Sequence, residues 1–157
     1  ESYRDSLKTL ISQYKLNDDV RFIDHYLSEA ELDQLITSAD VVLLPYDSVE
    51  QVTSGVLVEA LVAGVPIVAT NFPHAREVLS DNSGILVKQQ DALGIALAIR
   101  AILISKNRAD AMRHRLQRKS VAFLWPAIGK KYLEVLSSLD SSLDSSEMLN
   151  ASETLVG

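Results

Sequence analysis

Residues 51–70 read QVTSGVLVEALVAGVPIVAT, and this stretch decides the fold. Its apolar run predicts a helix over 53–64, because Ser54 supplies a side-chain oxygen for the unpaired amides of the first turn and Gly64 suits a left-handed stop. After a Val-Pro corner, residues 67–70 form a short apolar run. The stretch therefore predicts a helix that is followed at once by a buried strand.

The start of this helix has the features of an anion site. Gly55 lets a ligand approach the backbone, and the first-turn amides and the helix dipole both favour an anion there. Glu59 is the single charge in the apolar run, about one and a half turns into the helix. Gln51, Thr53 and Ser54 offer neutral hydrogen bonds, whereas Glu59 offers a charged acceptor. A phosphate or a polyhydroxyl group is therefore the expected ligand.

The rest of the chain alternates short apolar strands with helices. Strands are predicted at 20–23, 41–44, 67–70 and 83–87, and further helices at 3–15, 28–38, 74–79, 92–104, 106–120 and 126–139. Such alternation predicts an α/β fold, in which a doubly wound parallel sheet lies between helices. We predict one domain over 1–139 and a disordered tail over 140–157, where Ser-Ser-Leu-Asp repeats and hydrophobic periodicity fades.

Composition narrows the class of protein. The chain has 157 residues, of which 47% are hydrophobic, enough for one sizeable core. It has no cysteine, which excludes disulfides and thiolate zinc sites and fits a reducing compartment, so a cytoplasmic location is expected. No apolar run reaches the length of a membrane span, and no signal-peptide pattern opens the chain. Because it begins at Glu1 within a helical pattern, we expect a piece of a longer protein.

The charge pattern gives no sign of a nucleic-acid partner. The net charge of −6 comes mostly from residues 137–157, which carry four carboxylates and no Lys or Arg. The body of the chain is therefore close to neutral. His114 lies among basic residues, most simply a solvated helix face. Contact of this face with anionic lipid is the alternative, and it would allow peripheral membrane association of the parent protein.

Ligands of open parallel sheets bind at the carboxyl ends of the strands. In this chain those positions are 24–28, 45–53, 71–74 and 88–91. The second is the longest, and it leads directly into the Thr-Ser-Gly helix start. Metal-ligand spacings such as Asp-x-Asp and His-x-x-x-His are missing from the sequence, so no metal site and no bound cofactor are expected.

Two segments, QVTSGVLVEA (51–60) and AGVPIVAT (63–70), carry a resemblance. They resemble the Rossmann-like carboxy-terminal half of a GT-B fold glycosyltransferase of the retaining group 1 class (family 4). That family has an acidic residue, seven others and then a glutamate, followed by Gly-x-Pro-Val-Val-Ala-Thr. Glu59 matches the glutamate, which binds the ribose hydroxyls of the sugar nucleotide in the family. Gln51 replaces the first acid and retains the ability to hydrogen-bond sugar hydroxyls.

The resemblance assigns further residues. Positions whose backbone amides face the donor diphosphate and sugar fall on Ser54, Gly55 and Val56. His74 stands in the place of a glycine pair that faces the donor, and Glu77 matches a later Glu-Val segment. Trp125 matches the aromatic position where the last helix crosses back to the amino-terminal domain. The base contacts of the family follow an earlier strand end, here Asp24, His25, Tyr26, Leu27 and Ser28.

The function that the resemblance implies is donor binding. The parent enzyme would move a hexose from a nucleoside diphosphate sugar to an acceptor hydroxyl with retention, in partnership with an amino-terminal acceptor domain. The family's strand order is 3-2-1-4-5-6, of which this chain holds strands 3 to 6. The strand at 20–23 is therefore expected to lie loose or to pair wrongly against 41–45. The phosphate-clamping basic residues of the family are also missing, so this chain alone should be inactive.

Two other interpretations stay open at this stage. A non-catalytic doubly wound module, such as a receiver-like or interaction domain, would use acids at strand ends and a lysine on a later strand. Asp24 and Asp47 are candidates, but Lys88 is the only plausible lysine and its spacing is poor. A nucleotide-sugar epimerase would share the two-domain GT-B architecture. Without a family in mind, Glu59 would more often be a solvent-facing helix residue.

Overall fold

The computed structural model describes residues 2–48, 50 and 52–154, with side chains described between 3 and 139. The chain divides into two compact units, residues 1–31 and 32–157. This division lies inside the single domain that the sequence predicts over 1–139, and the extent of that domain stays a prediction.

The first unit contains one long helix, α1 (Ser2–Gln13), and an extended segment. Residues 20–23 form no strand in the described part of this unit, contrary to the prediction from their apolar sequence. A strand needs a neighbour to pair its backbone groups, and here the segment contacts α1 instead. The guanidinium of Arg4 lies 5.3 Å from the centre of the Phe22 ring and forms an ion pair with Asp24. Within this unit, the segment is therefore held by contacts with α1 and is not paired as a strand.

The second unit is built on a parallel sheet. Its described strands are β1 (Val42–Leu44), β2 (Ile67–Thr70) and β3 (Gly84–Val87), in the order β1-β2-β3. Val42 is opposite Ile67, which in turn is opposite Gly84. All four residues of β2 are buried, as expected of a central strand with both faces covered. The doubly wound α/β class predicted from the sequence is thus confirmed.

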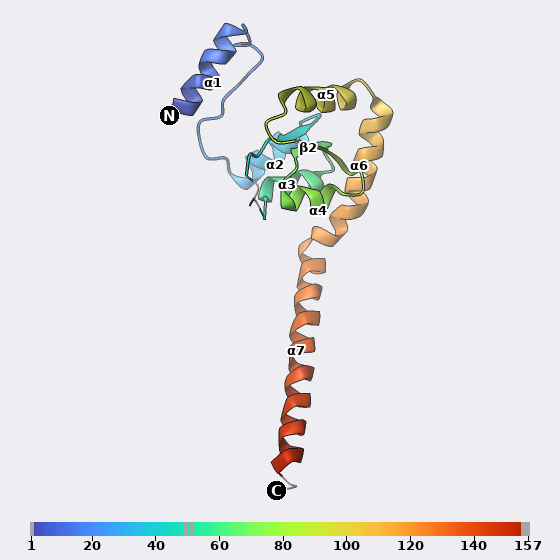
Figure 1. Ribbon diagram of the computed structural model, residues 1–157. Coiled ribbons are helices and arrows are strands. Elements are labelled where there is room, and N and C mark those ends of the chain that lie inside the picture. Colours follow the sequence, from blue (N-terminus) through green and yellow to red (C-terminus); the bar gives the residue numbers. More distant parts are fainter. Residues whose placement is uncertain (1, 49, 51, 155–157) are drawn as a thin grey trace. The chain divides into compact units, whose positions relative to one another are not determined.

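Helices surround these strands (Figure 1). They are α2 (Glu29–Thr37), α3 (Gly55–Ala63), α4 (Pro73–Leu79), α5 (Ala92–Leu103) and α6 (Lys106–Ser120). Both α3 and α5 pack on β2, and α6 packs against both of these helices. Leu57, Leu61 and Leu116 are fully buried in the shared core. Burial of each such side chain stabilises the fold by about 2–3 kcal/mol.

Helix α3 begins and ends as its sequence predicts. Ser54 is the N-cap, and its hydroxyl accepts a hydrogen bond from the amide of Leu57. Gly64 is the C-cap in the left-handed conformation, with φ of 69°. A Cβ at Gly64 would also lie 3.3 Å from the Cγ of Gln117 on α6. Glycine therefore allows both the turn into β2 and the close packing of α6.

A short 3₁₀ turn, η1 (Val121–Phe123), joins α6 to the last helix, α7 (Trp125–Thr154). The backbone of α7 continues through 140–154, where composition predicts a disordered tail. Helices in proteins gain most of their stability from tertiary packing, and disorder of residues 140–157 in solution stays a prediction. Among the described residues, no helix combines the length and apolarity needed to cross a bilayer.

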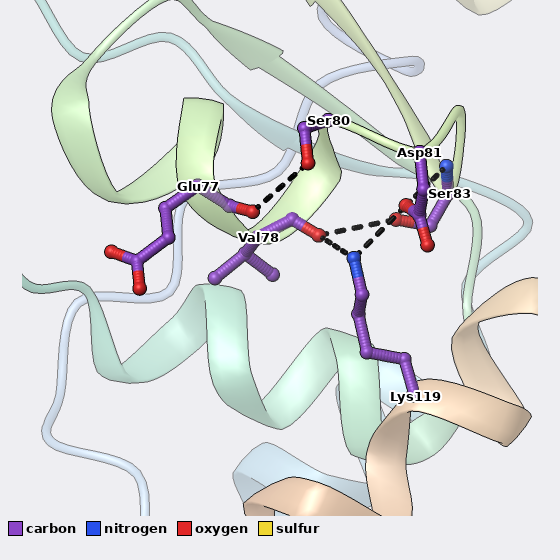
Figure 2. A network of polar contacts seen from close by, with 6 residues as sticks. All are labelled: Glu77, Val78, Ser80, Asp81, Ser83 and Lys119. Atoms are coloured by element: carbon purple, nitrogen blue, oxygen red, sulfur yellow. Dashed lines mark hydrogen bonds and ion pairs between the residues drawn. The ribbon is translucent and has the colours of Figure 1, made fainter.

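A polar network joins α6 to the turn between α4 and β3 (Figure 2). The ammonium of Lys119 donates to the carbonyl of Val78 and lies 2.9 Å from the carboxylate of Asp81. The buried hydroxyl of Ser83 donates to the same carbonyl across 3.3 Å. Because Val78 is in the last turn of α4, Lys119 and Ser83 satisfy a carbonyl that the helix leaves unpaired.

Candidate functional site

The N-terminus of α3 lies at the carboxyl edge of the sheet, and the structure describes partners for only some of its first amides. The amide of Ser54 donates to Nδ1 of His74 across 2.9 Å, and the amide of Leu57 donates to the Ser54 hydroxyl across 3.2 Å. Within the described part of the chain, the amides of Gly55 and Val56 have no hydrogen-bond acceptor. These two donors therefore remain for a ligand, at the end of the helix where the dipole favours an anion.

Two segments, one after β1 and one at the end of β2, support this helix start. After β1, the hydroxyl of Tyr46 lies 3.3 Å from the hydroxyl of Ser54, and its ring contacts Phe72 with centroids 5.0 Å apart. At the end of β2, the buried hydroxyl of Thr70 lies within hydrogen-bond distance of two carbonyls of the β1 segment: 2.6 Å from that of Tyr46 and 3.2 Å from that of Leu44. The site is thus supported by side chains that also connect the strands.

The loops after β1 and β3 are also joined. The side-chain amide of Gln90 donates to the carboxylate of Asp47 across 2.8 Å. Both residues are exposed, so this contact contributes little stability by itself. It brings the loop after the third strand to the same edge of the sheet.

Glu59 lies on the exposed face of α3, one helical turn after Gly55. Leu57, Ala60 and Leu61 make up the opposite, buried face of this helix. Within the part of the chain that the structure describes, the carboxylate of Glu59 has neither an ion pair nor a hydrogen bond. It faces a hollow of about 360 Å³, which is otherwise apolar and is lined also by Val58, Val62, Phe123, Leu124, Trp125 and Ile128. This carboxylate is available to a ligand with hydroxyl groups.

The structure brings together most of the residues predicted for donor binding. Ser54, Gly55, Val56 and His74 meet at the start of α3, and Glu59 lies on the face that continues from Gly55. Thr53 is exposed beside this N-cap. Gln51, the residue in the place of the first acid, lies outside the described residues.

The residues predicted to bind the base belong to the first unit. Tyr26 is 96% exposed and His25 is also exposed, whereas Leu27 is half-buried. Asp24 is paired with Arg4. Ser28 has a structural role at the start of α2. Base binding by these residues stays a prediction.

Ser28 and Glu31 form the capping box that the sequence predicts. The hydroxyl and the amide of Ser28 donate to the carboxylate of Glu31 across 2.6 Å and 2.8 Å. The amide of Glu31 donates back to the Ser28 hydroxyl across 3.4 Å. The hydrogen bonds from the side chain and then the backbone of Ser28 lower the pKa of Glu31.

Tyr46, Thr70 and Gln90 were not singled out from the sequence. Each lies within a few residues of a strand end, so the general rule for parallel sheets could have indicated all three. Their pairing partners, however, depend on which strands are neighbours. In the described residues no group of His, Asp or Glu side chains is arranged to hold a metal ion.

The chain also matches a known protein family. A model of the family described as "Glycosyl transferases group 1" matches residues 1–120, most of the chain. The chain belongs to this family. The resemblance drawn from residues 51–70 is thereby confirmed at the level of the group 1 glycosyltransferases.

The chain is also similar to two curated proteins with different names. Glycogen synthase of Mycobacterium tuberculosis is 35% identical over 101 residues, which cover 61% of this chain and 24% of that protein. D-inositol 3-phosphate glycosyltransferase of Kineococcus radiotolerans is 30% identical over 143 residues, 85% of this chain and 32% of that protein. The chain thus spans about a quarter to a third of the length of these relatives.

Solved structures show the same fold. Sucrose-phosphate synthase from Thermosynechococcus elongatus superposes with a TM-score of 0.76 at 25% identity, over 90% of this chain and 35% of that one. Anabaena HepE, solved in complex with UDP-glucose, gives a TM-score of 0.77 at 23% identity, over 87% of this chain and 37% of that one. The group 1 chain therefore has the fold of part of a GT-B glycosyltransferase.

Proposed function

We propose that this chain is the donor-binding part of a glycosyltransferase that moves a hexose from a nucleoside diphosphate sugar to an acceptor hydroxyl, with retention. The proposal rests chiefly on one observation, the shared exposed face of α3. The amides of Gly55 and Val56 and the carboxylate of Glu59, which have no partner among the described residues, lie one helical turn apart on this face. A nucleoside diphosphate has a diphosphate and a ribose as adjacent groups, which suit these donors and this acceptor.

Each residue then has a distinct role in the proposal. Glu59 accepts hydrogen bonds from the ribose hydroxyls, and the amides of Gly55 and Val56 donate to the diphosphate. His74 donates from Nε2 toward the sugar, because its Nδ1 is already the acceptor of the Ser54 amide. Gln51 and Thr53 contact the sugar from the preceding loop. The base is held by the segment 24–28.

The fold accommodates a ligand of this class, since HepE was solved with UDP-glucose. Stabilisation of the departing diphosphate needs donors fixed where negative charge develops. The first-turn amides of α3 are such donors, and in the proposal the reaction needs no protein-bound metal. The acceptor is bound by an amino-terminal domain of the parent enzyme, so this chain by itself does not catalyse.

Titration with nucleoside diphosphates tests the proposal. UDP, ADP and GDP are added separately to the 157-residue chain, and the melting temperature is followed. At about one hundred times its Kd the preferred ligand stabilises the fold by about 2.7 kcal/mol, a shift of about 5–10 °C for a chain of this size. Glu59→Ala should weaken binding about tenfold or more, since hydrogen bonds to a charged group contribute about 1.5–3 kcal/mol.

Asp33→Ala is the matched control, because it removes an exposed carboxylate from another helix, α2. This variant should bind like the wild type. If all three nucleotides leave the melting temperature of the wild type unchanged, the donor-binding proposal is wrong. If Asp33→Ala and Glu59→Ala weaken binding equally, the assignment of Glu59 is wrong. The family match favours glycosyl transfer over the interaction module and the epimerase considered from the sequence.

A further inference from the structure

A second hollow lies at the other edge of the sheet, away from the N-terminus of α3. Its volume is about 270 Å³, and it is bounded by α6, by the start of β3 and by the turn before it. Gly84, the first residue of β3, is part of its wall. Because ligands of the donor site approach the carboxyl ends of the strands, this α6 hollow is separate from that site.

One face of α6 brings two arginines to this hollow. Arg108 and Arg115 line it together with Ala111 and Met112, at the i, i+3, i+4 and i+7 positions of a single helix face. The two arginine Cα atoms are about 10 Å apart along the helix, and the small side chain of Ala111 lies between them. The long arginine side chains can therefore approach one ligand from two sides.

These arginines differ from Arg113 and Lys119 of the same helix, which have ion-pair partners. Arg113 pairs with Asp110 across 3.2 Å, and Lys119 pairs with Asp81 across 2.9 Å. Over the described residues, neither the Arg108 nor the Arg115 guanidinium has an ion pair or a hydrogen bond, and no carboxylate lines the hollow. The hollow is consequently a region of uncompensated positive charge.

The opposite wall is fixed relative to α6. Asn82 lines the hollow in a left-handed conformation, with φ of 61°, and its side-chain amide has no partner among the described residues. The residues on either side of Asn82 belong to the network around Lys119, which is itself on α6 (Figure 2). The same helix therefore carries both arginines and holds the turn that faces them, so the donors need little rearrangement to bind a ligand.

We propose that the α6 hollow is a binding site for a small ligand carrying phosphate groups, distinct from the donor site. Guanidinium groups form paired, charge-assisted hydrogen bonds with phosphate oxygens. The separation of Arg108 and Arg115 suits two linked phosphates better than one. The amide of Asn82 supplies a third, neutral donor. This site does not depend on the proposed glycosyl transfer.

Pyrophosphate is the probe, and residue-resolved NMR of the 157-residue chain is the readout. Backbone amide shifts at Asn82, Gly84 and Ala111 should change together and saturate, with a Kd of about a millimolar or lower. Pyrophosphate can also bind the free amides of α3, and the position of the shifts separates the two sites. Inorganic phosphate should bind the hollow more weakly than pyrophosphate does.

Arg108→Ala/Arg115→Ala should weaken the response in the hollow at least about tenfold and leave shifts at Gly55 and Val56 unchanged. Lys106→Ala/Arg118→Ala removes the same charge from α6 outside the hollow and should bind like the wild type. Should the double variant fail to fold, Arg108→Ala alone is used, because Arg108 is exposed.

Three results would overturn the proposal. The first is an absence of shifts at Asn82, Gly84 and Ala111. The second is equal weakening in both double variants, which would show attraction to general charge. The third is displacement of pyrophosphate by a glutamate-rich peptide that binds more tightly, which would make the hollow a protein-docking site.

Discussion

Nδ1 of His74 accepts a hydrogen bond from the backbone amide of Ser54 across 2.9 Å. The bond joins the first turn of α4 to the N-cap of α3. Because Nδ1 is the acceptor, the neutral ring carries its proton on Nε2. A single side chain thus satisfies a helix-start amide and keeps a second polar atom for other contacts.

Replacing His74 should loosen the start of α3. In His74→Ala the partly buried amide of Ser54 loses its acceptor, which should lower the free energy of unfolding by about 1–2 kcal/mol. His74→Asn retains a side-chain oxygen near the position of Nδ1 and should recover much of this loss. Urea denaturation of the three proteins measures the difference; equal stability of the alanine and asparagine variants would contradict the role of the acceptor.

The hydroxyl of Thr70 should contribute to the stability of the fold. This buried group lies within hydrogen-bond distance of the carbonyls of Tyr46 and Leu44. Thr70→Val keeps the shape of the side chain but leaves the carbonyls without this donor, so the unfolding free energy should fall by about 1–3 kcal/mol. Thr70→Ser retains the donor and should be less damaging. Thermal denaturation ranks the two variants, and the reverse order would refute the interpretation.

Gly64→Ala should destabilise the chain by at least about 1 kcal/mol, because the left-handed conformation disfavours a Cβ. Contact with Gln117 would add to this cost. Gly129→Ala is the control, since Gly129 lies within α7 with open space around it. There alanine should be neutral or slightly stabilising. Chemical denaturation of both variants measures the contrast, which would be absent if α3 could end equally well without glycine.

Asp81 should make the free energy of unfolding depend on pH under acidic conditions. Partial burial acts to raise its pKa, but hydrogen bonds from Ser83 and Lys119 and the charge of Lys119 outweigh this effect and lower the pKa from 3.8 to about 2. The unfolded chain therefore takes up a proton at higher pH than the folded chain does. The contribution of Asp81 is complete above about pH 4 and is lost as the pH falls toward 2.

Asp81→Asn should reduce this acid dependence and slightly lower stability at neutral pH. Asp81 is about half exposed, so the contribution at neutral pH is expected to stay below about 1 kcal/mol. Unfolding free energies measured between pH 2 and pH 6 test the sign. Lys119→Met, which removes the paired charge, should also make the unfolding free energy depend less on pH below about pH 4. If the slope of unfolding free energy against pH is unchanged in both variants, the Asp81–Lys119 pair is not its source.

Local sequence predicted the parts of the fold that depend on neighbouring residues. The caps of α3 at Ser54 and Gly64, and the capping box of Ser28 and Glu31, need only side chains a few positions apart. The buried strand after Gly64 was likewise evident from its apolar run. The strand at 20–23 was predicted wrongly, because strand formation depends on a pairing neighbour that apolar sequence does not reveal.

The sequence predicted which residues form the site, but it did not predict the contacts that hold them in place. Glu59 and the amides after Ser54 followed from the helix pattern and from the resemblance. The supporting contacts of Tyr46, Thr70 and His74 join residues 8 to 26 positions apart. They depend on the order of the strands in space, which the sequence pattern alone leaves undetermined. The α6 hollow likewise required the packing of α6 against the start of β3.

Each outer strand of the described sheet has one bonded neighbour, since both β1 and β3 pair with β2. Among the described residues the far side of β1 has no strand partner, so its backbone donors and acceptors are a place where another extended chain could pair. At high concentration this edge of β1 should promote self-association. A charged substitution at half-buried Val42 should reduce that self-association.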